Sequence, residues 1–103
     1  MRERPLLSDF EPHVGSSFRL NMDVENLSLD IVLVGAQELR SGPQADLPDA
    51  SFSLLFCGPL EHELPQMIRH LEHPEIGDMD LFLVPVQEDE EGRYYEAIFN
   101  YAC

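Results

Sequence analysis

Apolar and polar residues alternate along much of this chain. In the stretch from Ser17 to Met22, Phe18 and Leu20 fall on one face and Arg19 on the other. Successive side chains of a strand point to opposite faces, so a period of two predicts half-buried β-strands. The same pattern recurs at residues 27–34, 52–57, 79–86 and 94–101. The chain is therefore predicted to consist mainly of strands.

Turn-forming residues separate these predicted strands. Residues 23–26 predict a tight turn, and the charged segment 87–93 predicts a solvated hairpin loop. Gly35 is expected to relax the strand twist or to form a bulge. Pro85 has no N–H to donate, so it belongs at an edge, a bulge or a strand end. Residues 40–50 are rich in chain breakers and predict a long loop.

The stretch from residue 64 to residue 73 fits two different structures. Four apolar residues have the spacing of one helix face, which predicts a short helix near residues 64–72: Leu64, Met67, Ile68 and Leu71. The same stretch also alternates as a strand does, and a sheet that closes on itself needs a strand here to cover an unpaired edge. Both structures stay open, with the strand marginally favoured.

The length of the chain limits its architecture. One hundred and three residues can bury one modest core but cannot support two independent domains. We therefore expect a single all-β domain over residues 1–103, a small barrel or sandwich of about five to seven mostly antiparallel strands. Residues 1–9 are a candidate flexible arm, and the loop from Ser41 to Asp49 is a candidate contact segment.

Several segments together resemble a known family. They run from Phe10 through Gly15 to Phe18, and then as FSLLFCGP at 52–59, LEHPEIG at 71–77, LFLVPV at 81–86 and YEAIFN at 95–100. This series is similar to a family of small uncharacterised bacterial proteins, a domain of unknown function associated with genes for phage-tail-collar-like proteins. The resemblance implies a compact all-β domain that takes part in assembling or capping a tail-like appendage. It carries over no catalytic residue.

The charge of the chain excludes several partners. Twenty Asp and Glu stand against six Arg, so the formal net charge is -14. Such a chain is not expected to bind nucleic acid phosphates or an anionic lipid surface. It contains no apolar stretch long enough for a membrane helix and no continuous apolar segment typical of a signal peptide, so we expect a cytoplasmic protein. Cys57, expected to be buried, and Cys103 are expected to be free thiols.

The densest charge run lies in the predicted hairpin. This run, with the two tyrosines that follow it, is the predicted site of contact with a protein partner: Glu88, Asp89, Glu90, Glu91, Tyr94 and Tyr95. An alternative interpretation is that the acidic surface mimics nucleic acid and inhibits a basic protein. Glu96 is predicted to be either solvated or paired with Arg19, Arg69 or Arg93.

A second alternative is a small metal-dependent enzyme that uses His62, His70 and His73. These histidines lie within twelve residues among several carboxylates, and both groups are metal ligands. On a strand, however, His70 and His73 point to opposite faces, and no His-Glu-x-x-His pattern occurs. The simpler interpretation is a solvated acidic edge with His73 in a turn. No phosphate loop, nucleophile elbow or Cys-x-x-Cys pair is present either. We therefore expect a non-catalytic interaction module without a cofactor.

Overall fold

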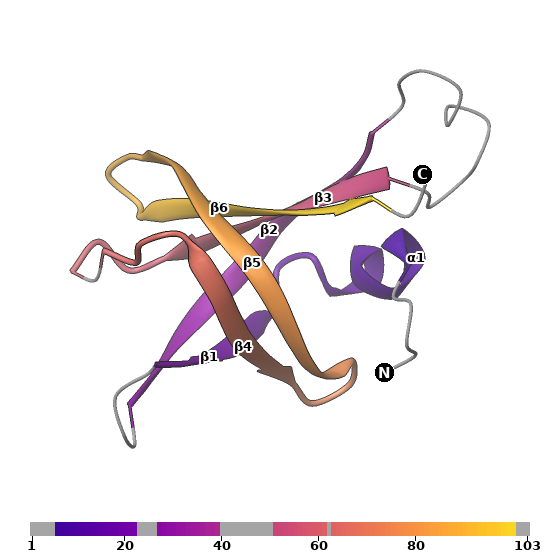
Figure 1. Ribbon diagram of the computed structural model, residues 1–103, viewed down its shortest axis with the longest axis horizontal. Helices are drawn as coiled ribbons and strands as arrows, with labels where there is room; N and C mark the ends of the chain where they lie inside the picture. Colours follow the sequence, from indigo (N-terminus) through magenta and orange to yellow (C-terminus); the bar gives the residue numbers. More distant parts are fainter. Residues whose placement is uncertain (1–5, 23–26, 40–50, 62, 101–103) are drawn as a thin grey trace.

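The residues that the structure describes fold into a closed barrel of six antiparallel strands (Figure 1). The computed structural model describes residues 6–22, 27–39, 51–61 and 63–100. The strands are β1 (Ser17–Asn21), β2 (Ser28–Glu38), β3 (Ser51–Gly58), β4 (Met67–His73), β5 (Gly77–Glu88) and β6 (Arg93–Asn100). Around the barrel they follow the order β1-β2-β3-β6-β5-β4. The predicted all-β class is confirmed, and the barrel is the form it takes.

The alternation of the sequence becomes the inside and outside of the barrel. In β3 every second residue is buried, from Phe52 through Leu54 and Phe56 to Gly58. In β1 the buried residues are Phe18 and Leu20. The inward side chains of all six strands meet in one apolar core. Burial of that continuous apolar surface is the main favourable term in folding.

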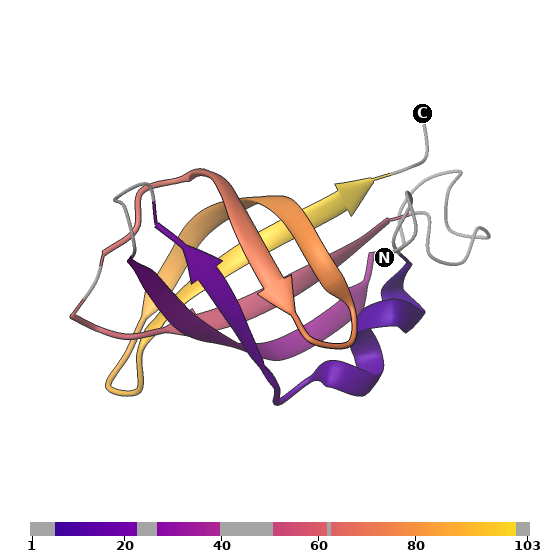
Figure 2. The same ribbon diagram turned by 90° about the horizontal axis from the view of Figure 1, so that it is seen from below.

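The barrel closes where β4 pairs with β1 (Figure 2). The pairing is short, because only residues 19–21 of β1 meet residues 70–72 of β4. On its other side β4 pairs with β5 along its whole length, from Met67 to His73. Residues 67–73 are therefore a strand, and the predicted alternative of a helix near 64–72 is wrong. The apolar spacing that suggested a helix has another origin, since Leu64 lies before the strand while Ile68 points outward.

Two strands contain bulges at the positions that the sequence marked. In β2 the register shifts between Leu33 and Gly35, so Val34 is the extra residue. In β5 it shifts between Pro85 and Gln87, so Val86 is the extra residue. A bulge adds twist and leaves one residue without a ladder partner. The bulge predictions for Gly35 and Pro85 are therefore confirmed.

A short helical segment covers one end of the barrel. It consists of α1 (Leu7–Phe10) and the 3-10 turn η1 (Glu11–His13). The ring of Phe10 lies 6.1 Å from that of Phe52 and 5.7 Å from that of Phe99. Leu7 is also buried. Residues 1–5 of the candidate flexible arm lie outside the described residues. Within the described residues, no helix is long and apolar enough to cross a membrane.

The segment between β3 and β4 covers the opposite end of the barrel. These two strands are three places apart in a ring of six, so the chain that joins them has to pass across the barrel opening. Leu64 in this segment is buried in the core, and its backbone N–H donates to the hydroxyl of Tyr95 at 3.2 Å. Arg69, which points inward, donates to the carbonyl of Pro65. The predicted turn 23–26 and the long loop 40–50 lie outside the described residues.

Candidate functional site

The acidic hairpin between β5 and β6 has two different kinds of acid. Asp89 Oδ1 accepts from the backbone N–H of Glu91 at 2.8 Å and of Gly92 at 3.3 Å, which closes the turn. Glu88 pairs with Arg93 at 3.0 Å. Glu90 and Glu91 have no side-chain partner among the described residues and are exposed. Two of the four predicted contact acids therefore hold the turn, and two face solvent.

Hydrogen bonds around Asp89 shift the pKa values of two groups. The backbone N–H of Glu91 is the first cause of a lowered pKa for Asp89. The hydroxyl of Tyr94 donates to Asp89 Oδ2 at 3.0 Å, and this bond raises the pKa of Tyr94 to about 12. Tyr94 is thus tied to the hairpin and stays protonated at neutral pH. It remains accessible to a partner.

The hairpin packs tightly against β3. A Cβ at Gly92 would lie 2.5 Å from the carbonyl oxygen of Gly58 and 2.6 Å from Sγ of Cys57, so only glycine fits there. Cys57 is half-buried on the outer side of β3, which corrects the expectation of a buried thiol. Burial nevertheless raises its pKa, so it is a poor nucleophile. Cys103 lies outside the described residues.

Tyr95 is not a contact residue. Its side chain is 1% exposed and points into the core, because it follows Tyr94 on a strand and so faces the opposite side of the sheet. Glu96 returns to the outer face, where it lines a hollow with Gly35 and Leu55. It makes no ion pair within the described part of the chain, so of the two predicted alternatives it takes the solvated one.

The histidines of β4 lie on opposite faces, as the strand prediction requires. His70 is on the outer face, where its Nδ1 lies 2.9 Å from Asp80 Oδ1 and its Nε2 lies 3.7 Å from Glu72 Oε2 and 3.8 Å from Asp78 Oδ2. The hydrogen bond to Asp80 is the main reason for a raised pKa of His70. We call His70, Glu72 and Asp78 the seam cluster, because β4 closes the barrel here.

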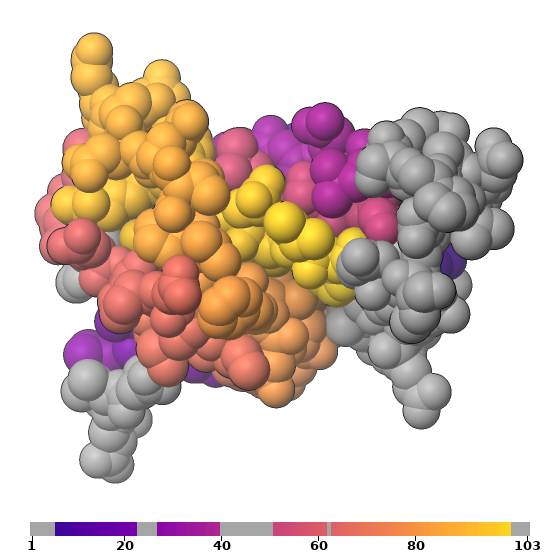
Figure 3. Space-filling model, turned by 45° about the horizontal axis from the view of Figure 1, so that its top comes forward, coloured from indigo at the N-terminus to yellow at the C-terminus, as the bar shows by residue number. Residues whose placement is uncertain are grey.

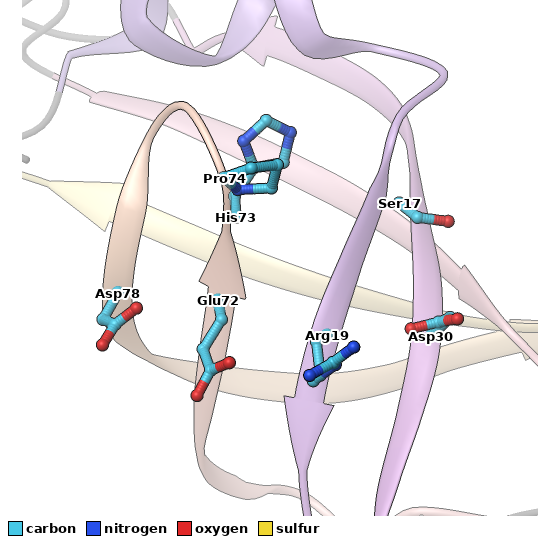
Figure 4. A pocket seen from close by; sticks show the side chains of 7 residues that line it. All are labelled: Ser17, Arg19, Asp30, Glu72, His73, Pro74 and Asp78. Carbon is cyan, nitrogen blue, oxygen red and sulfur yellow. The ribbon is translucent and has the colours of Figure 1, made fainter.

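Two members of the seam cluster, Glu72 and Asp78, line an open hollow of about 450 Å³ (Figure 4). A row of charged side chains crosses four neighbouring strands there, with Asp30, Arg19, Glu72 and Asp78 side by side. Although Arg19 is opposite both Asp30 and Glu72 in register, it forms no ion pair with any described residue. Among the described residues, His70 is therefore the basic side chain that approaches both carboxylates, at 3.7 Å from Glu72 and 3.8 Å from Asp78.

His73 occupies a buried site at the end of the barrel that α1 covers. It is 6% exposed, which corrects the expectation of a solvated turn. Its Nδ1 accepts from the backbone N–H groups of Glu75 at 3.1 Å and Ile76 at 3.2 Å. The ring packs against Phe18 at 4.5 Å and His13 at 4.7 Å between centroids. Burial, followed by the neighbouring His13, lowers the pKa of His73.

Ser16 and His73 lie as close together as a catalytic serine and its general base, but His73 cannot take the proton of the Ser16 hydroxyl. His73 Nε2 is 3.1 Å from Ser16 Oγ. Because Nδ1 accepts two backbone N–H groups, the neutral ring carries its proton on Nε2 and donates it to the serine. Ser16 in turn donates to the carbonyl of His13 at 2.6 Å. A general base needs a free lone pair toward the hydroxyl, and this pair has none.

Exposed apolar side chains form the feature that the sequence prediction missed. Ile68 is 64%, Phe82 51% and Ile98 62% exposed on the outer faces of β4, β5 and β6. Ile68 pairs directly with Phe82, and Phe82 and Ile98 both lie two residues beyond the Val84–Glu96 pair. We call these three residues the apolar strip. Figure 3 shows β4, β5 and β6 side by side on this side of the molecule. Each of these apolar residues falls on the strand face that the alternation predicts to be polar, and this was the sequence feature that could have revealed the strip.

The three predicted metal ligands are not brought together. His73 points inward and has no free lone pair, while His62 lies outside the described residues. Of the histidines that the structure describes, only His70 belongs to a group of side chains with the spacing of metal ligands, and its neighbours are carboxylates of β4 and β5. The candidate loop Ser41–Asp49 also lies outside the described residues.

Comparison with known proteins gives one result. The model of the family described as a domain of unknown function, DUF6916, matches residues 5–99. The chain belongs to this family. The match runs from α1 through β6 and so includes the seam cluster, the apolar strip and the acidic hairpin. The chain matches no curated protein and no solved structure.

Proposed function

We propose that this member of the DUF6916 family is a non-catalytic protein-interaction module, and that the apolar strip is its contact surface. The observation that carries the proposal is the exposure of Ile68, Phe82 and Ile98 on adjacent strands. Single exposed apolar residues are common, but neighbouring ones on one face mark sites of protein contact. The core does not need them, because the inward residues of the same strands already fill it.

Closure of the barrel limits how a partner can bind. An open sheet can accept an added strand along a whole edge, but every strand of this barrel has a neighbour on both sides, although the pairing of β1 with β4 is short. The partner therefore contacts outer side chains rather than backbone. An apolar patch with a polar rim is the usual composition of such a contact.

Charge specifies the chemistry of the partner. The pair next to Ile68 and Phe82 along the strands is His70 and Asp80, and Glu96 faces Val84 on the other side. With a net charge of -14, the module suits a protein whose apolar patch is surrounded by Arg and Lys. Glu90 and Glu91 at the exposed hairpin add to the attraction at long range. Their contribution is to the rate of association.

Two further observations support this role over catalysis and over mimicry of nucleic acid. The Ser16–His73 pair has the wrong proton arrangement for a nucleophile and its base. The apolar strip would be of no use in imitating phosphates. The resemblance to proteins encoded near phage-tail-collar-like genes supports a partner within a phage-tail-like assembly, which is the setting that we propose.

The test begins with a photo-crosslinking amino acid at position 82 and, as a control, at position 34. Val34 is also an exposed apolar residue, but it lies on β2. A protein captured from position 82 and not from position 34 is then purified, and its affinity for the module is measured by calorimetry. The double variant Ile68→Thr with Phe82→Thr should bind at least about tenfold more weakly, which corresponds to about 1.4 kcal/mol. Val34→Thr should bind as the wild type does.

Three outcomes would overturn the proposal. The first is that crosslinking from positions 82 and 34 captures the same proteins. The second is that the double variant binds the captured protein with the affinity of the wild type. The third is a concentration-dependent dimer that the double variant abolishes, because the strip would then bind a second copy. Binding that disappears in high salt but is insensitive to the double variant would favour the nucleic-acid mimic instead.

A further inference from the structure

The seam cluster places three different ligand atoms around one point on the barrel surface. One ligand atom from each of His70, Glu72 and Asp78 lies within 4.8 Å of the other two. Nε2 of His70 is 3.7 Å from Oε2 of Glu72 and 3.8 Å from Oδ2 of Asp78. They come from two strands whose register is set by seven consecutive pairs. The side chains are half-exposed or exposed, so water and ions reach them freely.

Residues outside the cluster orient two of its ligands. Asp80 accepts a hydrogen bond from Nδ1 of His70 at 2.9 Å, which leaves the lone pair of the neutral ring on Nε2, facing Glu72 and Asp78. Asn21, across the seam on β1, donates to Glu72 Oε2 at 2.8 Å. A carboxylate behind a histidine and a hydrogen bond to a ligating carboxylate are the usual supports of a metal site. Neither contact is needed to close the barrel, because backbone pairs do that.

We propose that the seam cluster is a binding site for a divalent cation of the zinc class, with His70, Glu72 and Asp78 as ligands. In a tetrahedral zinc site the bond lengths of about 2.0–2.2 Å place ligand atoms about 3.4 Å apart. The two distances from His70 Nε2 are 3.7 and 3.8 Å, which is within a few tenths of an ångström of this spacing. All three ligand atoms lie within 4.8 Å of one another, so the side chains have to draw closer together when they bind the ion. The fourth position faces solvent.

The ligand set and the surrounding charge determine the class of ion. An imidazole ligand favours zinc, cobalt or nickel over magnesium and calcium, which prefer oxygen ligands alone. The surroundings are strongly acidic, since Asp80 and Asp30 lie beside the cluster. Arg19 forms no ion pair with either cluster carboxylate in the described structure. A divalent cation would neutralise the two cluster carboxylates, which Arg19 does not pair with. The proposal does not depend on the proposed protein partner.

The experiment titrates untagged, full-length protein with zinc chloride and measures heat. About one equivalent should bind to the wild type. His70→Ala should abolish saturable binding, and Glu72→Gln and Asp78→Asn should each weaken it. Asp80→Asn, a positioning residue, should weaken it about 10- to 100-fold while leaving the stoichiometry unchanged. Cobalt bound to the wild type should have the visible absorption of a tetrahedral site, and Asp80→Asn should change that spectrum.

Two matched controls remove the same groups elsewhere. His13→Ala removes an imidazole from the end of the barrel, and Glu90→Gln removes a carboxylate from the hairpin. Both should bind zinc as the wild type does, and thermal unfolding checks that each variant is folded. If His70→Ala does not fold, Asp80→Asn and Asp78→Asn decide the question. Three results would refute the site: no saturable binding, binding that survives these changes, or calcium binding as tight as zinc binding.

Discussion

The two faces of β4 show how a barrel wall separates chemically identical groups. His70 and His73 are three residues apart on one strand, yet His70 lies outside among carboxylates and His73 lies inside against Phe18. The pKa of His70 is raised, chiefly by its hydrogen bond to Asp80, and that of His73 is lowered, chiefly by burial. One histidine is therefore available for binding, and the other is a structural acceptor for backbone N–H groups. Because the two histidines are an odd number of residues apart on one strand, their side chains point to opposite faces, and this places them in different surroundings.

The largest expected effect separates the two histidines by stability. His73→Ala removes the acceptor for two backbone N–H groups and leaves a cavity beside Phe18, so it should lower the free energy of unfolding by about 2–4 kcal/mol. His70→Ala changes only surface contacts and should stay within about 0.5 kcal/mol of the wild type. Denaturant unfolding measures both variants. Equal losses would mean that the faces of β4 are not separated as described.

The same contrast occurs on β6, with a smaller expected effect. Tyr95 accepts a hydrogen bond from the buried N–H of Leu64, so Tyr95→Phe leaves that group unpaired and should cost about 1–3 kcal/mol. Tyr94→Phe removes an exposed bond to Asp89 and should cost clearly less. Thermal or denaturant unfolding of the two variants tests this order. The reverse order would place Tyr95, and not Tyr94, at the surface.

The smallest expected effect is on pH dependence. Because the folded-state pKa of His73 is below 6.5, its contribution to stability is present above about pH 6.5 and is lost as the pH falls below that value. The pKa of His70 is raised in the folded state, so its contribution to stability is present at low pH and is lost as the pH rises through the folded-state pKa. The groups that face His73 are His13 and Glu75.

Nuclear magnetic resonance can measure the two pKa values directly. The ring signals of His73 should titrate below 6.5 and those of His70 above it. In the His70→Ala variant, stability should fall as the pH drops below about 6.5, because the opposing contribution is absent. A pKa of His73 at or above 6.5 would contradict the buried, neutral ring.

The sequence predicts the strands well because their signal is local. Alternation in Ser17–Met22 and Phe52–Cys57 needs only one buried face, and β1 and β3 begin and end within one residue of those limits. The ambiguity at residues 64–72 is different. Its apolar residues serve two purposes, since Leu64 covers the barrel end and Ile68 faces solvent. Local spacing could not separate them, and the pairing of β4 with β1 and β5 did.

The candidate site was predicted only in part. The sequence pointed to His70, but with His62 and His73 as its companions, because neighbours along the chain were the only neighbours visible. Asp78 and Asp80 reach His70 through the register of β4 with β5. The apolar strip was missed for a related reason. Apolar residues on both faces of a strand are typical of a sheet that is covered on both sides, whereas on the outer face of this barrel they remain exposed.

The sequence by itself determined which segments extend, which face of each strand is apolar and how negative the molecule is. These properties depend on residues one or two positions apart or on a simple sum of charges, so no distant contact is needed to establish them. The tertiary structure decided that the sheet closes, that His73 is enclosed, and that His70 meets Asp78 and Asp80. Each of these depends on strand register, which hydrogen bonds between segments far apart in the chain determine.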